Sequence, residues 1–322
     1  MQEETPSHSV PLHSMPHKNR FATWAFIIAS IAVVLTAIII IFATYMPDLF
    51  RPLTASLLPA DLKDGFFLYQ QDKVNTLYRM TDGNYAPVSL GSTFSTLSIS
   101  RRGNHVASIQ LGPENIYEVR GDTTLLYGSE DVKTSAAISP NGMRVAFAQA
   151  SRAGIETAHD TNKAIFPTRV MLLSEGTTTP RYIGAGFSPF FISDSEVAWF
   201  SEQGIIKYNI DNGVSSIYAP NVIATPVPYP APAVSRDAAL VAWVTPDTAT
   251  AHLGLLTPQG VREIATYVDA KSPSLVLGSS ALYFIQHSTT GDTLWKYGLT
   301  ANSSGSTIPG LPAFGTLIDI AL

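Results

Sequence analysis

The chain lacks cysteine altogether and is poor in charge. None of its 322 residues is cysteine, and only 14% are Asp, Glu, Lys or Arg. The first absence excludes disulfide scaffolds, thiolate metal sites and cysteine nucleophiles. The net charge is −5 and no long block of one sign occurs, so nucleic acid is not an expected partner.

The sequence motifs of several common enzyme classes are missing as well. There is no Gly-x-Ser-x-Gly elbow, no His-Glu-x-x-His, no phosphate-binding Gly-x-x-x-x-Gly-Lys-Ser/Thr and no Asp-x-Asp calcium loop. A zinc site needs three or four converging ligands, whereas His105, His159, His252 and His287 are scattered over different parts of the chain. The sequence therefore predicts surface histidines, no catalytic residue, no metal site and no cofactor.

A long apolar run lies near the N-terminus. Residues 21–45 carry no charge, and at about 1.5 Å per residue they are long enough to cross a hydrocarbon layer of about 30 Å. Trp24 and Tyr45 lie near the two ends, where aromatic rings prefer the interface. A cleaved signal peptide is the alternative, but its apolar core is normally only about 7–15 residues long and is followed by a small-x-small site. We therefore expect a single uncleaved transmembrane helix.

The charges that flank this run predict its orientation. Lys18 and Arg20 precede it, while Asp48 and Arg51 cancel on the other side. Because positive residues stay inside, the N-terminus is expected in the cytoplasm and the bulk of the chain outside, in the periplasm or the extracellular space. The expected parts are a tail (1–20), a transmembrane helix (21–45), a linker (46–60) and an external domain (61–322).

The external domain contains six similar units. An apolar trio recurs at intervals of about 40 to 50 residues, and each trio is followed by a second apolar run that ends in a polar turn. The trios are Phe67-Leu68-Tyr69, Val106-Ala107-Ser108, Val145-Ala146-Phe147, Val197-Ala198-Trp199, Val241-Ala242-Trp243 and Leu282-Tyr283-Phe284. Units of about 40 residues with four short strands each are typical of the blades of a β-propeller.

A tight turn led by serine precedes the trio in three of the units. In Ser139-Pro140-Asn141-Gly142 the second-position proline and fourth-position glycine suit a type I turn between antiparallel strands. Ser100-Arg101-Arg102-Gly103 and Ser235-Arg236-Asp237-Ala238 stand at the equivalent places. These turns and trios resemble the TolB-type, WD-like propeller repeat, which has a Ser-Pro-Asp-Gly turn followed by an Ile/Val-Ala-Phe strand. The resemblance implies a propeller over about residues 60–322, acting as a periplasmic scaffold, a sensor or an accessory domain of a hydrolase.

The C-terminal residues predict how the ring closes. Residues 314–320 (Phe-Gly-Thr-Leu-Ile-Asp-Ile) resemble residues 94–100 (Phe-Ser-Thr-Leu-Ser-Ile-Ser), the strand that opens the second unit. The first unit has no such strand before Phe66. We therefore expect the C-terminal strand to become the inner strand of the first blade and to close an all-β, six-bladed propeller. Closure removes exposed sheet edges, which otherwise invite aggregation.

Two long loops are the expected recognition elements. Residues 150–168 join the second and third strands of the third unit, and residues 219–233 join the fourth and fifth units. By strand count both open on one face, where lengthened loops are typical of binding, although such loops are also often merely mobile. The candidate partner-binding residues are Arg152, Glu156, His159, Asp160 and Lys163 in the first loop, and Pro226 and Tyr229 in the stiff, proline-rich second loop.

Trp199 and Trp243 occupy equivalent trio positions and allow two interpretations. They form either an aromatic platform for sugars or part of the core between blades, and their place in the trio favours the core.

The leading functional hypothesis is a membrane-anchored, extracytoplasmic propeller that acts as a non-catalytic binding or scaffold module. Its partner is expected to be a protein, a peptide or an envelope polymer. The alternative is a hydrolase or lyase that acts on a glycan or peptide in the propeller funnel. Two or more carboxylates at the mouth of the central channel favour the enzyme. A third hypothesis is a passive spacer in a larger membrane complex.

Overall fold

The computed structural model describes residues 58–88, 96–102, 105–110, 115–120, 122–153, 168–224, 232–245, 250–267, 274–286, 292–300, 303–309, 311–312 and 314–322. The expected tail (1–20), transmembrane helix (21–45) and most of the linker lie outside these ranges. Within them, we find no helix that is both long and apolar enough to cross a membrane.

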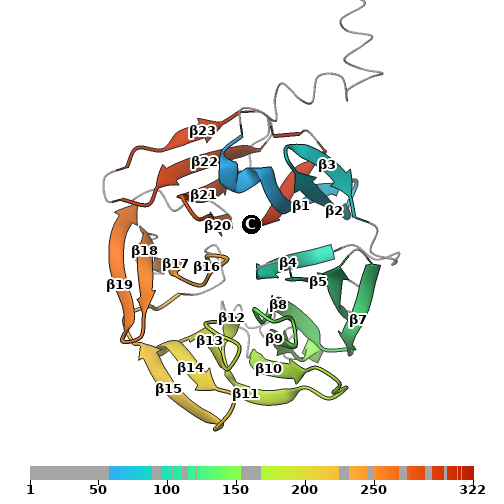
Figure 1. The fold of residues 1–322 in the computed structure, drawn as a ribbon, viewed down its shortest axis with the longest axis vertical. Helices are drawn as coiled ribbons and strands as arrows, with labels where there is room; N and C mark the ends of the chain where they lie inside the picture. The colour runs from blue at the N-terminus through green and yellow to red at the C-terminus, as the bar shows by residue number, and fades with distance from the viewer. Residues whose placement is uncertain are drawn as a thin grey trace, which may run out of the picture. The chain divides into compact units, whose positions relative to one another are not determined.

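The described strands form six four-stranded antiparallel sheets arranged around a common centre (Figure 1). Strands are given from the innermost outwards. Sheet 1 contains β24 (Thr316–Ala321), β1 (Asp64–Gln71), β2 (Val74–Thr81) and β3 (Asn84–Pro87). Sheet 2 contains β4 (Thr96–Arg102), β5 (His105–Gln110), β6 (Asn115–Arg120) and β7 (Asp122–Gly128). Sheet 3 contains β8 (Val132–Ile138), β9 (Arg144–Ala150), β10 (Arg169–Ser174) and β11 (Arg181–Ala185).

The other three sheets follow in chain order. Sheet 4 contains β12 (Phe187–Phe191), β13 (Glu196–Ser201), β14 (Gly204–Asn209) and β15 (Val214–Ala219). Sheet 5 contains β16 (Ala233–Val234), β17 (Leu240–Thr245), β18 (Thr250–Thr257) and β19 (Gly260–Tyr267). Sheet 6 contains β20 (Ser274–Leu277), β21 (Ala281–Gln286), β22 (Thr293–Gly298) and β23 (Ser306–Ile308). This arrangement confirms an all-β propeller.

Each apolar trio lies in the second strand of its sheet, as the sequence predicted. Where their side chains are described, these strands are buried on both faces; in β9, for example, every residue after Arg144 is buried. A continuous apolar run, rather than an alternating one, is what a strand covered on both faces requires. The trio therefore marks the part of each sheet that neighbouring sheets cover.

Six hydrophobic clusters fill the spaces between neighbouring sheets. Trp199 is 2% exposed in the cluster between sheets 3 and 4, and its indole N–H donates to the carbonyl of Ala185 at 2.9 Å. Trp243 is buried between sheets 4 and 5, and Phe147 between sheets 2 and 3. The structure thus confirms the core interpretation of both tryptophans.

The C-terminal strand closes the ring, as predicted. β24 pairs with β1, with Ile320 opposite Phe67 and Asp319 opposite Leu68. A short 3-10 helix, η2 (Ala60–Lys63), precedes β1 and buries Leu62 in the cluster between sheets 6 and 1. The two ends of the described chain therefore meet in one sheet.

Helix η2 is also tied to the first turn of sheet 6. The Asp61 carboxylate accepts hydrogen bonds from the hydroxyls of Ser279, Ser280 and Tyr283 at 2.5, 2.6 and 3.2 Å. Burial alone would raise the pKa of Asp61, but these donors outweigh it and lower that pKa. An ionised Asp61 thus links sheet 6 to the start of sheet 1.

Replacing Trp199 with alanine should remove the largest side chain between sheets 3 and 4. Because the neighbouring strands cannot fully collapse onto the space, we expect the free energy of unfolding to fall by about 3–5 kcal/mol. Denaturant unfolding followed by circular dichroism measures this loss. The control is Tyr182→Ala on the neighbouring strand β11, since Tyr182 is 54% exposed. Equal losses for the two variants would contradict the packing described here.

Candidate functional site

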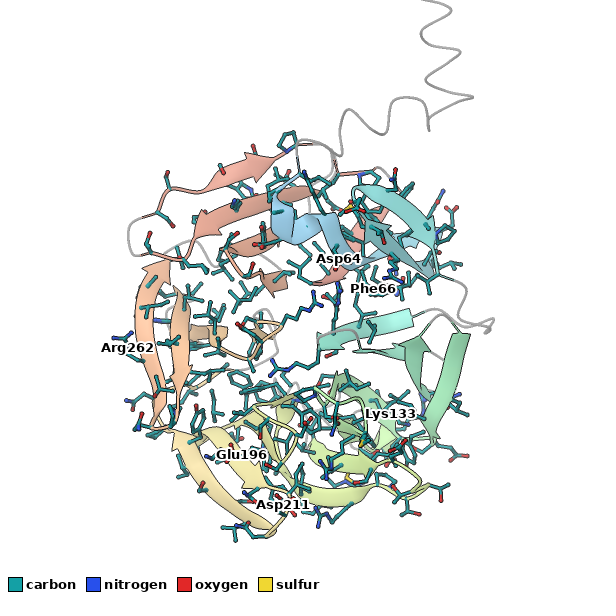
Figure 2. The ribbon with its side chains drawn as sticks, viewed as in Figure 1. Asp64, Phe66, Lys133, Glu196, Asp211 and Arg262 are labelled. Carbon is teal, nitrogen blue, oxygen red and sulfur yellow. The ribbon has the colours of Figure 1, made fainter. Side chains whose placement is uncertain are left out.

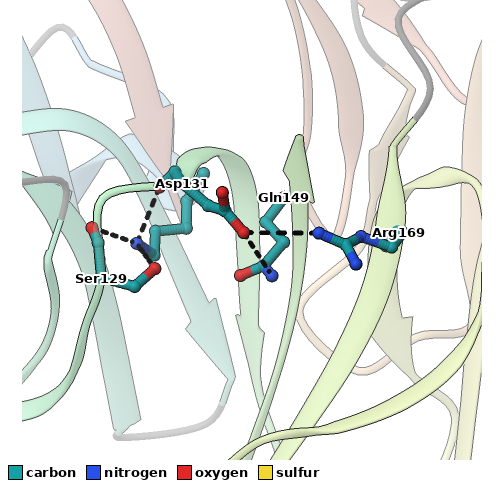
Figure 3. A network of polar contacts seen from close by, with 5 residues as sticks. Ser129, Asp131, Gln149 and Arg169 are labelled. Atoms are coloured by element: carbon teal, nitrogen blue, oxygen red, sulfur yellow. Dashed lines mark hydrogen bonds and ion pairs between the residues drawn. The ribbon is translucent and has the colours of Figure 1, made fainter. Parts of the chain in front are cut away.

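The first long loop leaves and re-enters sheet 3 at a network of polar contacts (Figure 3). Gln149 lies near the end of β9 and Arg169 begins β10, so the two residues flank the loop. The Asp131 carboxylate accepts a hydrogen bond from the Gln149 amide at 3.1 Å and lies 3.4 Å from the Arg169 guanidinium. A single carboxylate therefore holds both ends of the loop.

Lys133 extends this network into the interior. Lys133 is 2% exposed, and its ammonium donates hydrogen bonds to the carbonyl and the hydroxyl of Ser129 at 3.0 and 2.7 Å. It also donates to the carbonyl of Asp131 at 2.8 Å and lies 5.3 Å from the centre of the Tyr127 ring. A buried ammonium is tolerated only when its donors are satisfied, which fixes the segment before β8.

Only one of the predicted partner-binding residues belongs to the described part of the chain. Arg152 is exposed and lies two residues beyond the end of β9. Six others lie outside the described residues: Glu156, His159, Asp160, Lys163, Pro226 and Tyr229. The structure therefore describes the base of the first loop.

A cavity of about 360 Å³ follows the centre of the ring and is lined by all six innermost strands. In each innermost strand, one residue pairs with the middle residue of the trio on the second strand. In sheet 1 this residue is Asp319, so the corresponding residues of the other five innermost strands lie at the same level of the channel. The other five are uncharged: Ser100, Ala137, Phe190, Ala233 and Val276. Asp319 is thus the single charge at this level of the channel.

The next level contains one arginine among apolar residues. Arg101 stands where the other strands have Ile138, Phe191, Val234, Leu277 and Ile320. Its side chain is only 5% exposed, because it turns towards sheet 1 rather than solvent.

There Arg101 pairs with Asp64. It donates to the Asp64 carbonyl at 3.0 Å and to its carboxylate at 2.9 Å, and its guanidinium lies 5.7 Å from the centre of the Phe66 ring. Figure 2 shows Asp64 and Phe66 near the centre of the ring. Burial raises the pKa of Asp64, but the hydrogen bond and charge of Arg101 lower it by more. We interpret this pair as a link between sheets 1 and 2.

Arg102 crosses one end of the channel. Its guanidinium donates to the carbonyls of Arg236 at 2.6 Å and Ile192 at 3.5 Å, which belong to sheets 5 and 4. No described carboxylate lies within ion-pair distance of this guanidinium. Burial lowers the pKa of Arg102, and the charges of Asp237 and Asp194 only partly oppose that effect.

Asp319 lies inside the channel, where its carboxylate accepts hydrogen bonds from the backbone N–H groups of Ile320 at 2.9 Å and Ile99 at 3.4 Å. Burial raises its pKa to about 6, although these two donors oppose the rise. No described lysine or arginine lies within ion-pair distance of it. The sequence analysis missed this residue, although a lone acid inside the apolar run of residues 317–321 was a visible signal.

The described residues that line the channel carry few charged side chains. Asp319 is the one side-chain carboxylate among them, and the other charged side chains are those of Arg101 and Arg102. No group of three or more His, Asp or Glu residues in the described part of the chain could hold a metal ion. The prediction of surface histidines is wrong in part for His252. Its side chain is only 19% exposed, because its ring stacks on Trp243 with 5.3 Å between the ring centres.

Comparison with known proteins supports the propeller fold. No family model and no curated protein matches the sequence. Among solved structures, TolB from Acinetobacter baumannii is 14% identical over 85% of this chain and 69% of its own, with a TM-score of 0.59. An oligogalacturonate lyase in complex with manganese is 12% identical over 75% of this chain and 72% of its own, with a TM-score of 0.52. A chain of a nidogen/laminin complex is 12% identical over 80% of this chain and 97% of its own, with a TM-score of 0.53.

Replacing Asp319 with asparagine should stabilise the protein at neutral pH. The folded state raises the pKa of this carboxyl from 3.8 to about 6, so its contribution to stability is lost as the pH rises through that range. The free energy of unfolding of the variant should therefore exceed that of the parent by at most about 3 kcal/mol at pH 7. This difference should shrink towards zero near pH 4. Urea unfolding at both pH values measures it. A difference that does not change with pH would contradict the assignment.

Proposed function

We propose that this chain is a membrane-tethered, six-bladed propeller outside the cytoplasm that binds a protein, a peptide or an envelope polymer without catalysing a reaction. The observation that carries the proposal is the polar network at the base of the first long loop, in which Asp131 contacts both Gln149 and Arg169. A loop whose two ends are fixed loses less conformational freedom when it meets a partner. Such a loop is suited to recognition.

The composition of the two loops supports a polar partner surface. Residues 150–168 carry Arg152, Glu156, His159, Asp160 and Lys163, charges of both signs that complement a mixed polar surface. Residues 219–233 carry Pro226 and Tyr229 in a proline-rich stretch, which favours a stiff, extended backbone with an aromatic side chain available for contact. Together they favour a macromolecular partner over a small ligand at this face.

The similar structures support the propeller fold on which this proposal rests. One was solved as a nidogen/laminin complex, an example of this fold in an assembly of two different proteins. At identities of 12–14% the likeness concerns the fold alone.

An enzyme is the second candidate. One similar structure is an oligogalacturonate lyase, and the Asp319 carboxyl, whose pKa burial raises to about 6, lines the channel where a substrate would bind. A carboxyl with such a pKa is able to act as a general acid or base near neutral pH. Release of reducing ends from oligosaccharides, lost in the Asp319→Asn variant, would favour this candidate.

Replacing residues 154–167 with a two-residue Gly-Ser turn should abolish partner capture and leave the fold intact. These residues follow the described base of the loop, and long insertions contribute little to stability. Crosslinking in intact cells followed by pull-down measures partner recovery, and circular dichroism measures the fold.

A matched control replaces the same segment with a Gly/Ser linker of the original length. Loss of capture in both variants assigns recognition to the side chains of the loop. Full recovery of the partner by the two-residue variant would contradict the proposal.

Deleting residues 1–45 should release the chain from the membrane fraction. The predicted transmembrane helix is the one long apolar run in the sequence, so the remaining chain has no comparable anchor. Fractionation after carbonate washing measures release. In the full chain, protease added outside the cytoplasmic membrane should digest loops of the external domain, and complete protection would contradict the predicted orientation.

A further inference from the structure

Three arginines gather around one carboxylate at the turn end of the ring, the end at which the serine-led first turns lie. Arg101 donates to the Asp64 carboxylate at 2.9 Å, and the Arg236 guanidinium lies 3.8 Å from the same oxygen atom. The guanidiniums of Arg79 and Arg101 lie 5.9 and 5.7 Å from the centre of the Phe66 ring. Burial raises the pKa of Asp64, but the hydrogen bond of Arg101 and the charges of all three arginines lower it by more. One carboxylate therefore serves three guanidinium groups.

The nearby carboxylates of sheets 4 and 5 are accompanied by other arginines. Burial lowers the pKa of Arg102, and the charges of Asp237 and Asp194 oppose that effect. The Arg144 guanidinium donates to the Asp194 carbonyl at 2.5 Å. Two carboxylates thus accompany two guanidiniums there, whereas at Asp64 one carboxylate accompanies three. Three positive charges less one negative charge leave a surplus of two at Asp64.

Arg236, in the first turn of sheet 5, is the arginine most affected by this surplus. Burial lowers its pKa, the like charge of Arg101 lowers it further, and the charge of Asp64 only partly opposes the two effects. The 3.8 Å between Arg236 and Asp64 exceeds the length of a hydrogen bond, so this contact is an ion pair alone. A second anion beside Arg236 therefore stabilises its charged form without displacing a hydrogen bond to Asp64.

Solvent reaches the groups at the surface of this cluster. The side chains of Arg236 and Asp64 are 39% and 52% exposed, and Arg79 is exposed as well. The Arg101 side chain, in contrast, is only 5% exposed. A ligand from solution thus contacts Arg236 directly, whereas Arg101 acts on it through its charge.

The surplus of charge indicates which anion suits the cluster. Guanidinium groups favour oxyanions whose oxygen atoms match their paired N–H donors, as those of carboxylates and phosphates do. A carboxylate supplies one negative charge, whereas a phosphate monoester supplies about 1.5 to 2 at pH 7. A surplus of two positive charges therefore favours a phosphate group over a carboxylate.

We propose that the turn end of the ring binds a phosphate group beside Asp64, with Arg236 as its direct contact and with Arg79 and Arg101 as the source of positive potential. This site goes beyond the proposed function, because it lies at the first turns, whereas the first long loop leaves sheet 3 at the end opposite its first turn. Free phosphate and phosphate esters share this chemistry, and the choice of probes separates them.

Three probes test the proposal without any change to the protein. The purified full chain is titrated at pH 8 and constant ionic strength with inorganic phosphate, glycerol 3-phosphate and acetate. We expect inorganic phosphate to bind at least about tenfold more tightly than acetate, since it meets both surplus charges. Glycerol 3-phosphate that binds as tightly as phosphate assigns the site to esters, and weaker binding assigns it to the free anion. No saturable binding of either phosphate probe, or equal affinities for all three probes, would overturn the proposal.

Two substitutions with opposite expected effects test the charge balance. Arg236→Gln should weaken the binding of inorganic phosphate by about tenfold. Asp64→Asn should tighten it, because loss of that carboxylate raises the positive surplus, whereas a merely structural role of the cluster predicts no tightening. Arg262→Gln is the matched control, because Arg262 is exposed and lies at the outer rim of the ring (Figure 2). A control that weakens binding as much as Arg236→Gln, or a folded Asp64→Asn variant that binds phosphate less tightly, would refute the site.

The variant that lacks residues 154–167 separates this proposal from the previous one. It should bind inorganic phosphate as the full chain does, because the deleted segment leaves sheet 3 at the other end. Circular dichroism checks that each variant folds. If Asp64→Asn fails to fold, the comparison of Arg236→Gln with Arg262→Gln and the three probes in the unchanged chain still decide the matter.

Discussion

In each sheet, the strand next to the innermost one must be covered on both faces, and the rest of the structure depends on this constraint. A four-stranded sheet alone would expose two apolar faces, and each face here is covered only by a neighbouring sheet. The ring must therefore close. β24 supplies the closure, since Leu317 and Ile320 pack towards sheet 6 while Ala321 packs towards sheet 2. The last strand of the chain is thus as central to the core as the first.

This constraint also limits where polar groups occur. The second strands have almost no room for charge, so charge appears on the inner strands, at their ends and in the first turns. Arg101 occupies an otherwise apolar level and is accommodated because Asp64 neutralises it and Phe66 lies beside it. Lys133 is accommodated because three oxygen atoms satisfy its ammonium. In both cases, residues outside the strand that carries the buried charge stabilise it.

The sequence predicted those features that repeat and those that are local. The trios, the Ser139 turn and the C-terminal strand follow from patterns of a few residues, and the structure places each as expected. The contacts of the charged residues in the channel could not be predicted from the sequence, because they are made with residues far apart in the chain. Arg102 meets Arg236, and Asp319 meets Ile99, only once six units have closed into a ring. The printed sequence shows that both residues are charged, but it does not show which residues they face in the ring.

The two ends of sheet 3 differ in their polar contacts. β8 starts at the base of the first long loop and ends at the Ser139 turn, so antiparallel pairing sends that loop and the first turns to opposite ends of sheet 3. At the turn end, the side chain of Asp194 accepts the Asn141 N–H and its carbonyl accepts from the Arg144 guanidinium, which ties sheets 3 and 4 together. At the loop end the polar network lies within sheet 3 and its preceding segment. Because the buried strand β9 separates the two ends, we expect a change at the loop end to leave the contacts at the turn end intact.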